Sequence, residues 1–477
     1  MTAPRPPLDP VRAALDHALH ALAGLGPELA GHANRIGTLL WSPPRIVIVG
    51  RLKAGKSTLV NALIGANVAE TAALEATNLV SVYQEGAPAR GEAVLLDGTR
   101  VPVPTDRGRI GHLPVEPHEV AYLHRWLPSA AIRNYTLVDT PGLATLTAEN
   151  ETRTRRVLID GFEQTRTASV DADAAVFLFD SAPRADEIEF LRQLGFTPLT
   201  TLGVLSRADA FGEGALGTRN PLAHADEHAA LLASRLVDTV MTVVPIAGLL
   251  AETSHTGALT EADARALHAL SGIAPFDLID LLDSEDDASV PPQVRGRLVD
   301  LLGEYGTLHG REVAAQGAAA LNEWLVTQSC VPRLHSILST HLAAFAAVKR
   351  AHRIIGELDR LAYSRPERDH IRDIVDRLRS DPALHTVVLF GHLEAMLTAD
   401  PTSPVTQELR RLVKHPTPAT KLGLSPDADE HLIMEAARDR LAWVHGRSLS
   451  TSTAAEDAAL VTLVRTYNTM LGHPGHR

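Results

Sequence analysis

The chain has 477 residues, of which 45% are hydrophobic and 4% aromatic, and its formal net charge at pH 7 is −12. This length exceeds what one compact core usually holds, so we expect two or three domains with ample apolar content for burial. The negative charge and the few aromatic side chains argue against a protein that binds nucleic acid through a general basic surface. The single cysteine, Cys330, cannot form an intrachain disulfide, and neither a secretory signal nor a bilayer-spanning apolar run is evident. We therefore expect a cytoplasmic protein that can contact a membrane only peripherally.

The N-terminal part of the chain begins with helical periodicity and continues with strands. Residues 8–40 repeat apolar positions three and four apart, with a break at 24–27, which predicts one broken helix or a helix pair. The run RIVIVG then predicts a buried strand, and STLVNALIG after it predicts a helix. Four further runs predict buried strands: YTLVDT at 135–140, AAVFLFD at 174–180, LTTLGVLSRAD at 199–209 and MTVVPIAG at 241–248.

The order of these elements indicates the fold class. Helical patterns separate most of the strands, which is typical of an α/β domain with a mainly parallel sheet and helices on both faces. Between STLVNALIG and YTLVDT, the segments VSVYQEG and AVLLDGTRVPV predict antiparallel edge strands of the same sheet. We place this domain at residues 41–285.

The C-terminal part of the chain changes character. After the acidic segment DSEDDASVPPQ the periodicity is helical alone, so we place a domain boundary there and assign residues 286–477 to a second domain. We expect its helices to pack with one another and with the N-terminal helices of residues 1–40, giving an elongated all-α bundle. The helical segments are 294–326, 329–363, 366–412, 427–447 and 452–472.

A phosphate-binding loop is the strongest motif. GRLKAGKST satisfies the pattern GxxxxGK[ST] between a predicted strand and a predicted helix, where backbone N–H groups and a helix N-terminus can face phosphate oxygens. The lysine would contact the β- and γ-phosphates, and the serine hydroxyl would ligate Mg²⁺. The nucleotide-binding residues of this loop are Gly50, Arg51, Leu52, Lys53, Ala54, Gly55, Lys56, Ser57 and Thr58.

A second motif, DTPG at 139–142, ends a predicted buried strand. A carboxylate placed there can hold the magnesium shell, and a flexible glycine N–H can sense the γ-phosphate, so Asp139 and Gly142 take these roles. Between the two motifs a threonine must reach Mg²⁺ and the γ-phosphate from a mobile loop, for which Thr71 and Thr77 are candidates. We choose Thr77, just before a strand, and expect a switch that depends on the bound nucleotide.

The base is expected to be read by SRAD at 206–209. Asp209 can accept hydrogen bonds from N1–H and the exocyclic amine of guanine, which adenine does not offer. Arg207 would lay its stem and guanidinium plane over the base, although Ser206 stands where asparagine or threonine is usual. In PIAG, the Ala247 backbone N–H is the candidate donor to guanine O6. GTP and GDP with Mg²⁺ are therefore the predicted ligands.

Taken together, GRLKAGKSTLVNALIG, EATNLVSVY, YTLVDTPGL, LSRAD and VVPIAGLLAET resemble the bacterial dynamin-like GTPases, most closely the isoniazid-inducible dynamin-like proteins of actinobacteria. The resemblance covers the nucleotide domain well and rests on looser helical features in the C-terminal half. It implies hydrolysis of GTP to GDP and phosphate, self-association through paired GTPase domains, and N- and C-terminal helices packed as neck and trunk. It also implies membrane binding or remodelling at the inner face of the cell membrane, with a related second protein as a candidate partner.

The chain departs from the family at two positions of the loop. Leu52 stands where other members have a catalytic glutamine, and Lys53 where they have a serine that helps to hold a monovalent cation. Our hypothesis is that Lys53 supplies in cis the positive charge that others recruit as a cation; a solvated loop lysine is the alternative.

Two other functions stay open. One is a regulatory switch that binds a protein or ribosomal partner without bending lipid, and the other is a scaffold with a degenerate nucleotide site. Within the bundle, HTVVLFGHLEAML at 385–397 suits a packed helix better than a membrane-inserting element, and the loop at 415–423 is a better place for a membrane-facing tip. HADEH at 224–228 resembles a zinc-peptidase motif, but a solvated helix face explains it.

Overall fold

The computed structural model describes residues 9–51, 53–69, 79–106, 108–141, 172–285 and 289–472. The chain forms two compact units, one made of Pro43–Phe345 and the other of Met1–Ser42 together with Ala346–Arg477. We call them the nucleotide unit and the helical unit. The sequence placed a boundary at residue 285, whereas the nucleotide unit extends 60 residues further, to Phe345.

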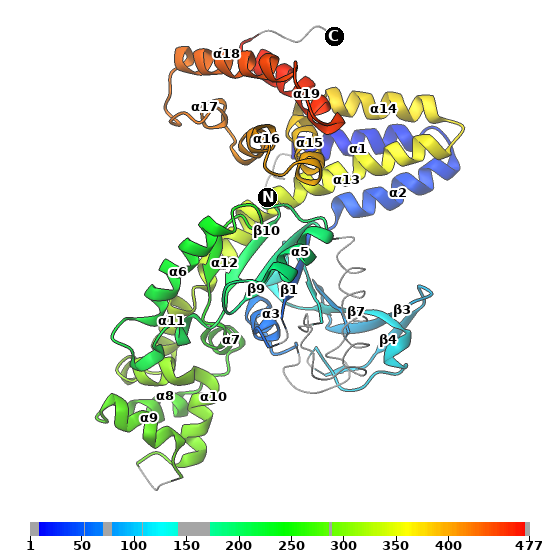
Figure 1. Cartoon of the computed structure of the whole chain (residues 1–477). Coiled ribbons are helices and arrows are strands. Elements are labelled where there is room, and N and C mark those ends of the chain that lie inside the picture. The colour runs from blue at the N-terminus through cyan, green and yellow to red at the C-terminus, as the bar shows by residue number, and fades with distance from the viewer. Residues whose placement is uncertain are drawn as a thin grey trace, which may run out of the picture. The chain divides into compact units, whose positions relative to one another are not determined.

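A nine-stranded sheet with the order β11-β10-β9-β1-β8-β2-β7-β3-β4 forms the centre of the nucleotide unit (Figure 1). The strands β11, β10, β9, β1 and β8 are parallel, β2 runs antiparallel to β8, and β3 and β4 are antiparallel at the edge. The predicted fold class, with its mainly parallel sheet, is confirmed, and the antiparallel edge is formed by β3 and β4. The segment VSVYQEG, predicted as an edge strand, is β2 and lies inside the sheet between β8 and β7. The strands are β1 (Arg45–Gly50), β2 (Ser81–Glu85), β3 (Arg90–Leu95), β4 (Arg100–Val103), β7 (Val120–Leu127), β8 (Thr136–Asp139), β9 (Ala174–Phe179), β10 (Thr201–Leu205) and β11 (Val243–Pro245).

The central strands are buried on both faces. Ile46 to Val49 of β1 and Ala174 to Phe179 of β9 are almost fully buried, as expected when helices cover both faces of a parallel sheet. A separate two-stranded sheet pairs β5 (Thr105–Asp106) with β6 (Arg109–Ile110). The α-helices of this unit are α3 (Lys56–Ile64), α5 (Ala185–Gln193), α6 (Pro221–Arg235), α7 (Gly248–Thr256), α8 (Glu261–His268), α9 (Pro275–Asp283), α10 (Pro292–His309), α11 (Ala318–Ser329) and α12 (Val331–Ile337). Short 3₁₀ turns are η2 (Pro117–Glu119), η3 (Ala130–Ile132), η4 (Ala208–Ala210), η5 (Gly214–Leu216) and η6 (Val313–Gln316), and η7 (Leu338–Leu342) is a π-helical turn.

Helices α10 and α11 belong to the nucleotide unit because they share its core. One apolar cluster joins residues of α7 and α8, such as Leu250 and Leu267, to residues of α10 and α11, such as Leu302 and Leu321. All four of these side chains are fully buried. This shared core is why the compact unit does not end at the acidic segment.

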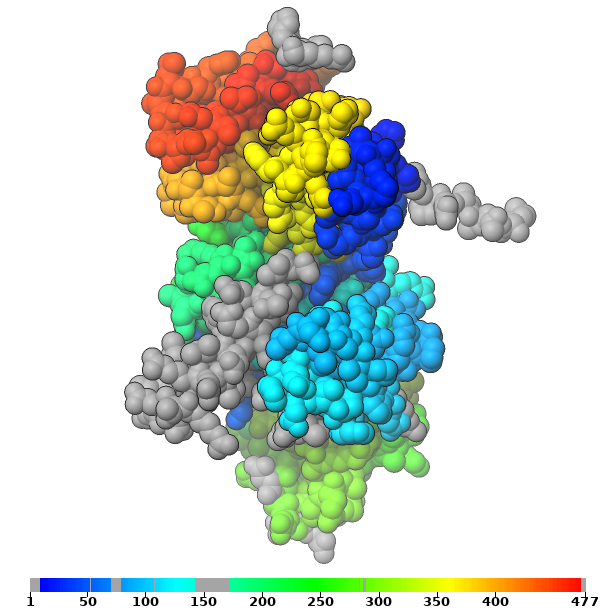
Figure 2. Space-filling model, turned by 90° about the vertical axis from the view of Figure 1, so that its right-hand side faces the viewer, coloured from blue at the N-terminus to red at the C-terminus, as the bar shows by residue number. Residues whose placement is uncertain are grey.

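The helical unit joins the two ends of the chain. The helices α1 (Pro10–Ala23) and α2 (Pro27–Trp41) form a pair, separated at Gly24 to Gly26, and share an apolar cluster with α13 (Ala343–Ser364) and α14 (Arg368–Ser380). Figure 2 shows the blue N-terminal helices lying against the yellow ones. The unit continues with η8 (Pro382–Leu384), α15 (His385–Ala399), α16 (Pro404–Lys414), α17 (Pro418–Lys421), α18 (Glu430–Arg447) and α19 (Ala454–Met470).

The apolar segment at 385–397 is a packed helix, as the spacing predicted. Val387, Leu389, Phe390, Leu393 and Met396 of α15 are all fully buried. Among the described residues, no helix has the length and apolar character needed to cross a membrane.

Two histidines of α15 face α19. The Nε2 atom of His385 lies 3.0 Å from Thr466 Oγ1, and that of His392 lies 2.8 Å from Thr462 Oγ1. Burial lowers the pKa of both imidazoles, and nearby cations lower it further, Lys421 beside His385 and Arg379 beside His392. Both rings are therefore neutral in the folded protein at neutral pH.

We expect the chain to lose stability as the pH falls below about 6.5, the usual pKa of histidine in an unfolded chain. Below that pH the unfolded chain binds more protons than the folded one, so acid favours unfolding. Thermal unfolding at pH 7.5 and pH 5.5 measures the effect, and H385Q/H392Q should show a smaller decrease of Tm than the wild type. An equal decrease in both proteins would contradict the assignment.

Candidate functional site

The predicted phosphate loop lies at the carboxyl end of the central strand β1. A Cβ atom on Gly50 would lie 2.3 Å from the carbonyl oxygen of Leu178 on β9, so only glycine allows this close approach. Gly55, with φ of 94°, adopts the left-handed conformation that glycine favours, and Lys53 has φ of 63°. Helix α3 then starts at Lys56 without a side-chain N-cap, which leaves its first N–H groups able to face an anion.

Lys56 is buried at the base of this loop. Its Nζ donates hydrogen bonds to the carbonyl oxygens of Gly50, at 3.2 Å, and Arg51, at 2.9 Å. Burial lowers the pKa of the ammonium group, while the nearby carboxylate of Asp139 raises it. The loop thus holds one cation in a place from which water is largely excluded.

Asp139 ends β8, the parallel neighbour of β1. Although the residue is partly exposed, its Oδ1 atom is buried and has no hydrogen-bond partner among the described residues. Burial raises the pKa of this carboxyl to about 6, against the opposing charges of Lys56 and Arg125. A buried acceptor without a donor, beside a phosphate loop, fits a carboxylate that faces the hydration shell of Mg²⁺.

An ion pair braces the loop. The guanidinium of Arg51 donates to both carboxylate oxygens of Glu187 on α5, Nε to Oε1 at 2.7 Å and Nη2 to Oε2 at 2.5 Å. Glu187 is only 4% exposed and also accepts from the backbone N–H of Arg184. The sequence did not indicate Glu187, because this residue lies 136 positions from Arg51 in a helix that carries no nucleotide-binding motif.

The predicted base-reading loop follows β10 and reaches the phosphate loop. The N–H of Ser206 donates to the carbonyl oxygen of Phe179 at 2.8 Å, and Arg207, with φ of 56°, donates from Nη2 to the carbonyl oxygen of Lys53 at 3.1 Å. Asp209 lies in η4 and is partly exposed. Burial raises the pKa of this carboxyl, and the charge of Arg207 lowers it.

The backbone amide predicted to donate to guanine O6 has an acceptor within the protein. The N–H of Ala247 donates to the carbonyl oxygen of Ser329 at the end of α11, at 3.3 Å, so it is engaged within the protein. The next residue, Gly248, opens α7, and a Cβ there would lie 3.4 Å from Thr58 Cγ2 of α3. Its N–H belongs to the first turn of α7, where helical amides have no intrahelical acceptor.

Four predicted or candidate residues lie outside the described part of the chain: Leu52, Thr71, Thr77 and Gly142. The chain just before the two threonines is held by Asn61 of α3. Its Oδ1 accepts from the N–H groups of Val68, at 2.9 Å, and Ala69, at 2.7 Å, while its Nδ2 donates to Glu252 Oε1 at 2.7 Å. Sequence reasoning also missed this asparagine.

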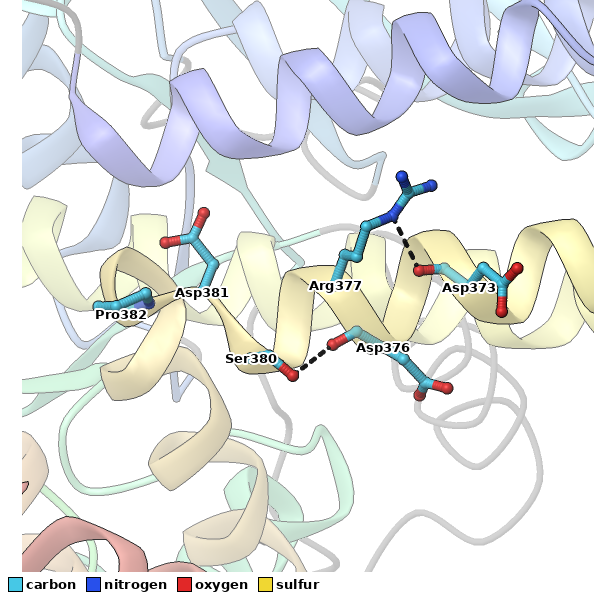
Figure 3. A pocket seen from close by; sticks show the side chains of 6 residues that line it. All are labelled: Asp373, Asp376, Arg377, Ser380, Asp381 and Pro382. Atoms are coloured by element: carbon cyan, nitrogen blue, oxygen red, sulfur yellow. Dashed lines mark hydrogen bonds between the residues drawn. The ribbon is translucent and has the colours of Figure 1, made fainter. Parts of the chain in front are cut away.

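Two further features belong to other parts of the chain. An open surface hollow of about 720 Å³ in the helical unit is lined by Asp373, Asp376, Arg377, Ser380, Asp381 and Pro382 (Figure 3). Its lining is largely acidic and includes none of the predicted nucleotide-binding residues. In HADEH, the imidazoles of His224 and His228 pack on the ring of Phe211, with centroids 4.9 and 5.0 Å away.

Comparisons with known proteins agree with the motifs. A family model described as a 50S ribosome-binding GTPase matches residues 45–201. The isoniazid-induced protein IniC of Mycobacterium tuberculosis, in strains CDC 1551 and H37Rv, is 31% identical over 454 residues, covering 88% of this chain and 89% of the relative. An uncharacterized protein in the xynA 3′ region of Caldicellulosiruptor sp. is 26% identical over 153 residues, covering 30% of this chain and 34% of the relative.

Two similar solved structures are described as an oligomerised bacterial dynamin pair for long-range sensing and tethering of membranes. The first has a TM-score of 0.33 and 14% identity, and the match covers 92% of this chain and 62% of that one. This chain thus spans about 62% of the length of the first structure. The second has a TM-score of 0.32 and 12% identity, with 97% and 90% covered.

Because the identity to IniC extends over most of both chains, this chain belongs to the family of the isoniazid-induced protein IniC, and its nucleotide unit is a P-loop GTPase domain.

Proposed function

We propose that this GTPase binds GTP with Mg²⁺ between the phosphate loop, Asp139 and the loop Ser206 to Asp209, and couples hydrolysis to membrane binding or remodelling. The observation that carries the nucleotide part is the placement of the buried Lys56 ammonium and the buried Asp139 Oδ1 beyond the ends of the adjacent parallel strands β1 and β8. Lys56 is largely shielded from water, so its positive charge can meet an anion. Asp139 Oδ1 has no hydrogen-bond donor among the described residues, so it can accept from the hydration shell of a cation. A magnesium-bound triphosphate satisfies both groups.

In this proposal different residues of the P-loop contact different parts of the bound nucleotide. The amides from Gly50 to Thr58 cradle the phosphate oxygens, Lys56 exchanges its carbonyl acceptors for β- and γ-phosphate oxygens, and Ser57 and Asp139 hold the magnesium site. Mg²⁺, when bound, stabilises negative charge that develops on the phosphates. Thr77 and Gly142 remain the proposed contacts to the γ-phosphate.

The base is proposed to lie between Arg207 and the start of α7. Asp209 accepts from guanine N1–H and the exocyclic amine, and Arg207 covers the ring, releasing its bond to the Lys53 carbonyl oxygen. We assign the donor to guanine O6 to Gly248, because the Ala247 amide is bonded to Ser329. A GDP-bound and a GTP-bound state would then differ in the segment that holds Thr77.

The membrane part rests on the resemblance to bacterial dynamin-like GTPases. Two segments of the helical unit are candidate membrane contacts, because each exposes a large apolar side chain. Tyr363 at the end of α13 is 83% exposed, and Leu449 after α18 is 90% exposed. The guanidinium of Arg372 lies 5.7 Å from the Tyr363 ring centroid. An aromatic ring beside a cation suits the interface of an anionic bilayer.

Self-association through GTPase domains, a related second protein and a location at the inner face of the cell membrane are further parts of this proposal. They follow from the same resemblance.

The two lysines of the phosphate loop should affect turnover differently. K56A is expected to reduce GTP turnover to background, because the buried charge that meets the phosphates is removed. K53A should lower turnover by about tenfold or more in potassium-free buffer, as expected for loss of an electrostatic contact to the transition state. Phosphate release measures both, with the exposed Lys414→Ala as control. Wild-type turnover of K53A without potassium would overturn the proposed role of Lys53.

Loss of the brace between Arg51 and Glu187 should weaken nucleotide binding. In E187Q an amide oxygen at the position of Oε2 can still accept from the Arg184 N–H and from Arg51 Nη2, but the second bond, from Arg51 Nε, and the negative charge beside the guanidinium are lost. We expect fluorescent GDP to bind about tenfold more weakly, the usual scale for a hydrogen bond to a charged group. E189Q is the matched control, since Glu189 lies exposed on the same helix. Equal affinity of both variants and the wild type would contradict this role.

Co-sedimentation with liposomes tests the membrane part. The wild type with a non-hydrolysable GTP analogue should pellet with vesicles containing phosphatidylserine and less with GDP or with neutral vesicles. The double variant Y363S/L449S should stay in the supernatant and keep its basal turnover, whereas F276S, a 70% exposed position on α9, should pellet like the wild type. If the wild type hydrolyses GTP and never pellets, a regulatory switch that binds a protein partner replaces the membrane proposal.

A further inference from the structure

Helix α10 contains a kink at a glycine. Gly303 has φ of 62° and ψ of −176°, a backbone conformation essentially confined to glycine. The interruption is anchored from α7, where the hydroxyl of Thr253 donates to the carbonyl oxygen of Leu301 at 2.5 Å. In an uninterrupted helix that carbonyl would accept from the N–H four residues later. Thr253 is itself 2% exposed, so the bond is shielded from water.

The kink lies beside both loops that are proposed to read the base. A Cβ atom built on Gly303 would lie 3.7 Å from Asp209 Oδ2 and 3.5 Å from Leu249 Cδ2. Asp209 is the guanine-reading carboxylate of the first loop, and Leu249 follows Gly248 in the second. A methyl group at this position would be in ordinary van der Waals contact with the carboxylate, so the backbone of α10 lies close to Asp209 on this side.

The surrounding contacts hold α10 and α11 in this place. A Cβ on Gly306 would lie 2.9 Å from Leu250 Cδ2, so α10 approaches α7 closely (Figure 1). The Tyr305 hydroxyl donates to Gln328 Oε1 at 3.1 Å and accepts from Asn220 Nδ2 at 3.4 Å. At the end of α11, the carbonyl oxygen of Ser329 accepts from the Ala247 N–H.

We propose that the Gly303 kink of α10 is a positioning element for Asp209, so that a helix outside the nucleotide-binding motifs sets the selectivity for guanine. The proposal rests on the proposed function, in which Asp209 reads the base. A carboxylate discriminates guanine only when it is held where it meets N1–H and the exocyclic amine together. The kink places the backbone of α10 beside that carboxylate, and the Thr253 bond holds the kink in place.

The substitution G303A tests the proposal. The added methyl group finds room, but its backbone must leave the left-handed region, so α10 has to rearrange beside Asp209. The measurement is the ratio of the dissociation constants for IDP and GDP, because inosine lacks only the exocyclic amine that Asp209 reads. We expect the ratio to fall by about tenfold or more, since a site built to hydrogen-bond a group discriminates strongly against its absence.

The matched control is G296A. Gly296 lies in the same helix, does not have a left-handed φ, and has nothing within 4 Å of an added Cβ. It should keep the wild-type ratio. A second variant, T253V, removes the hydroxyl that anchors the kink without changing the backbone of α10, and it should lower the ratio in the same direction. If circular dichroism and Tm show that G303A does not fold, the ratio measured for T253V is the test.

The outcomes separate the two proposals. If the wild type itself does not prefer GDP over IDP and ADP, the base-reading role of Asp209 is wrong, and the proposed function fails at that point. If the wild type prefers GDP and the folded variants keep its ratio, the kink does not position Asp209, even if they lose affinity for GDP and IDP equally. A lowered ratio in G303A and T253V with an unchanged ratio in G296A supports the positioning role.

Discussion

The nucleotide site depends on two opposite charges, a buried lysine and a carboxylate with one buried oxygen, that meet where parallel strands end. Lys56 follows β1 through the phosphate loop, and Asp139 ends the neighbouring strand β8, so the pairing of the two strands brings the charges together. Burying an ion is costly unless it is paired or hydrogen-bonded. The lysine bonds to two loop carbonyl oxygens, whereas Asp139 Oδ1 has no hydrogen-bond partner among the described residues. The fold thus leaves one group of the pair open to a ligand.

Around this pair the phosphate loop is fixed from two directions. Arg51 is tied to α5 by Glu187, and the carbonyl oxygen of Lys53 is tied to the base-reading loop by Arg207. The first contact is largely buried and the second is exposed, so they differ in how readily a nucleotide can replace them. A ligand that inserts between the loops breaks only the weaker contact, which keeps the loop pre-organised while the base side opens.

The helices after the acidic segment have a role that their position in the chain does not suggest. They share an apolar core with α7 and α8, they lie beside the base-reading loops at Gly303, and Ser329 accepts a hydrogen bond from Ala247. A rearrangement at the base would therefore reach α10 and α11 directly. The helical unit has a separate core made of the two ends of the chain, joined through α1, α2, α13 and α14.

The sequence by itself determined the features that depend on local spacing. GRLKAGKST, DTPG and SRAD are short motifs in which neighbouring residues share a loop, and runs such as RIVIVG become buried strands because their apolar residues are consecutive. The tertiary structure decided the features that join distant segments: the bond that occupies the Ala247 amide, the brace from Glu187, the extension of the nucleotide unit to Phe345, and the kink beside Asp209. Each of these depends on which residue 50 or more positions away packs at a given point, and no local pattern carries that information, because burial and hydrogen-bond geometry are set only when the whole core forms.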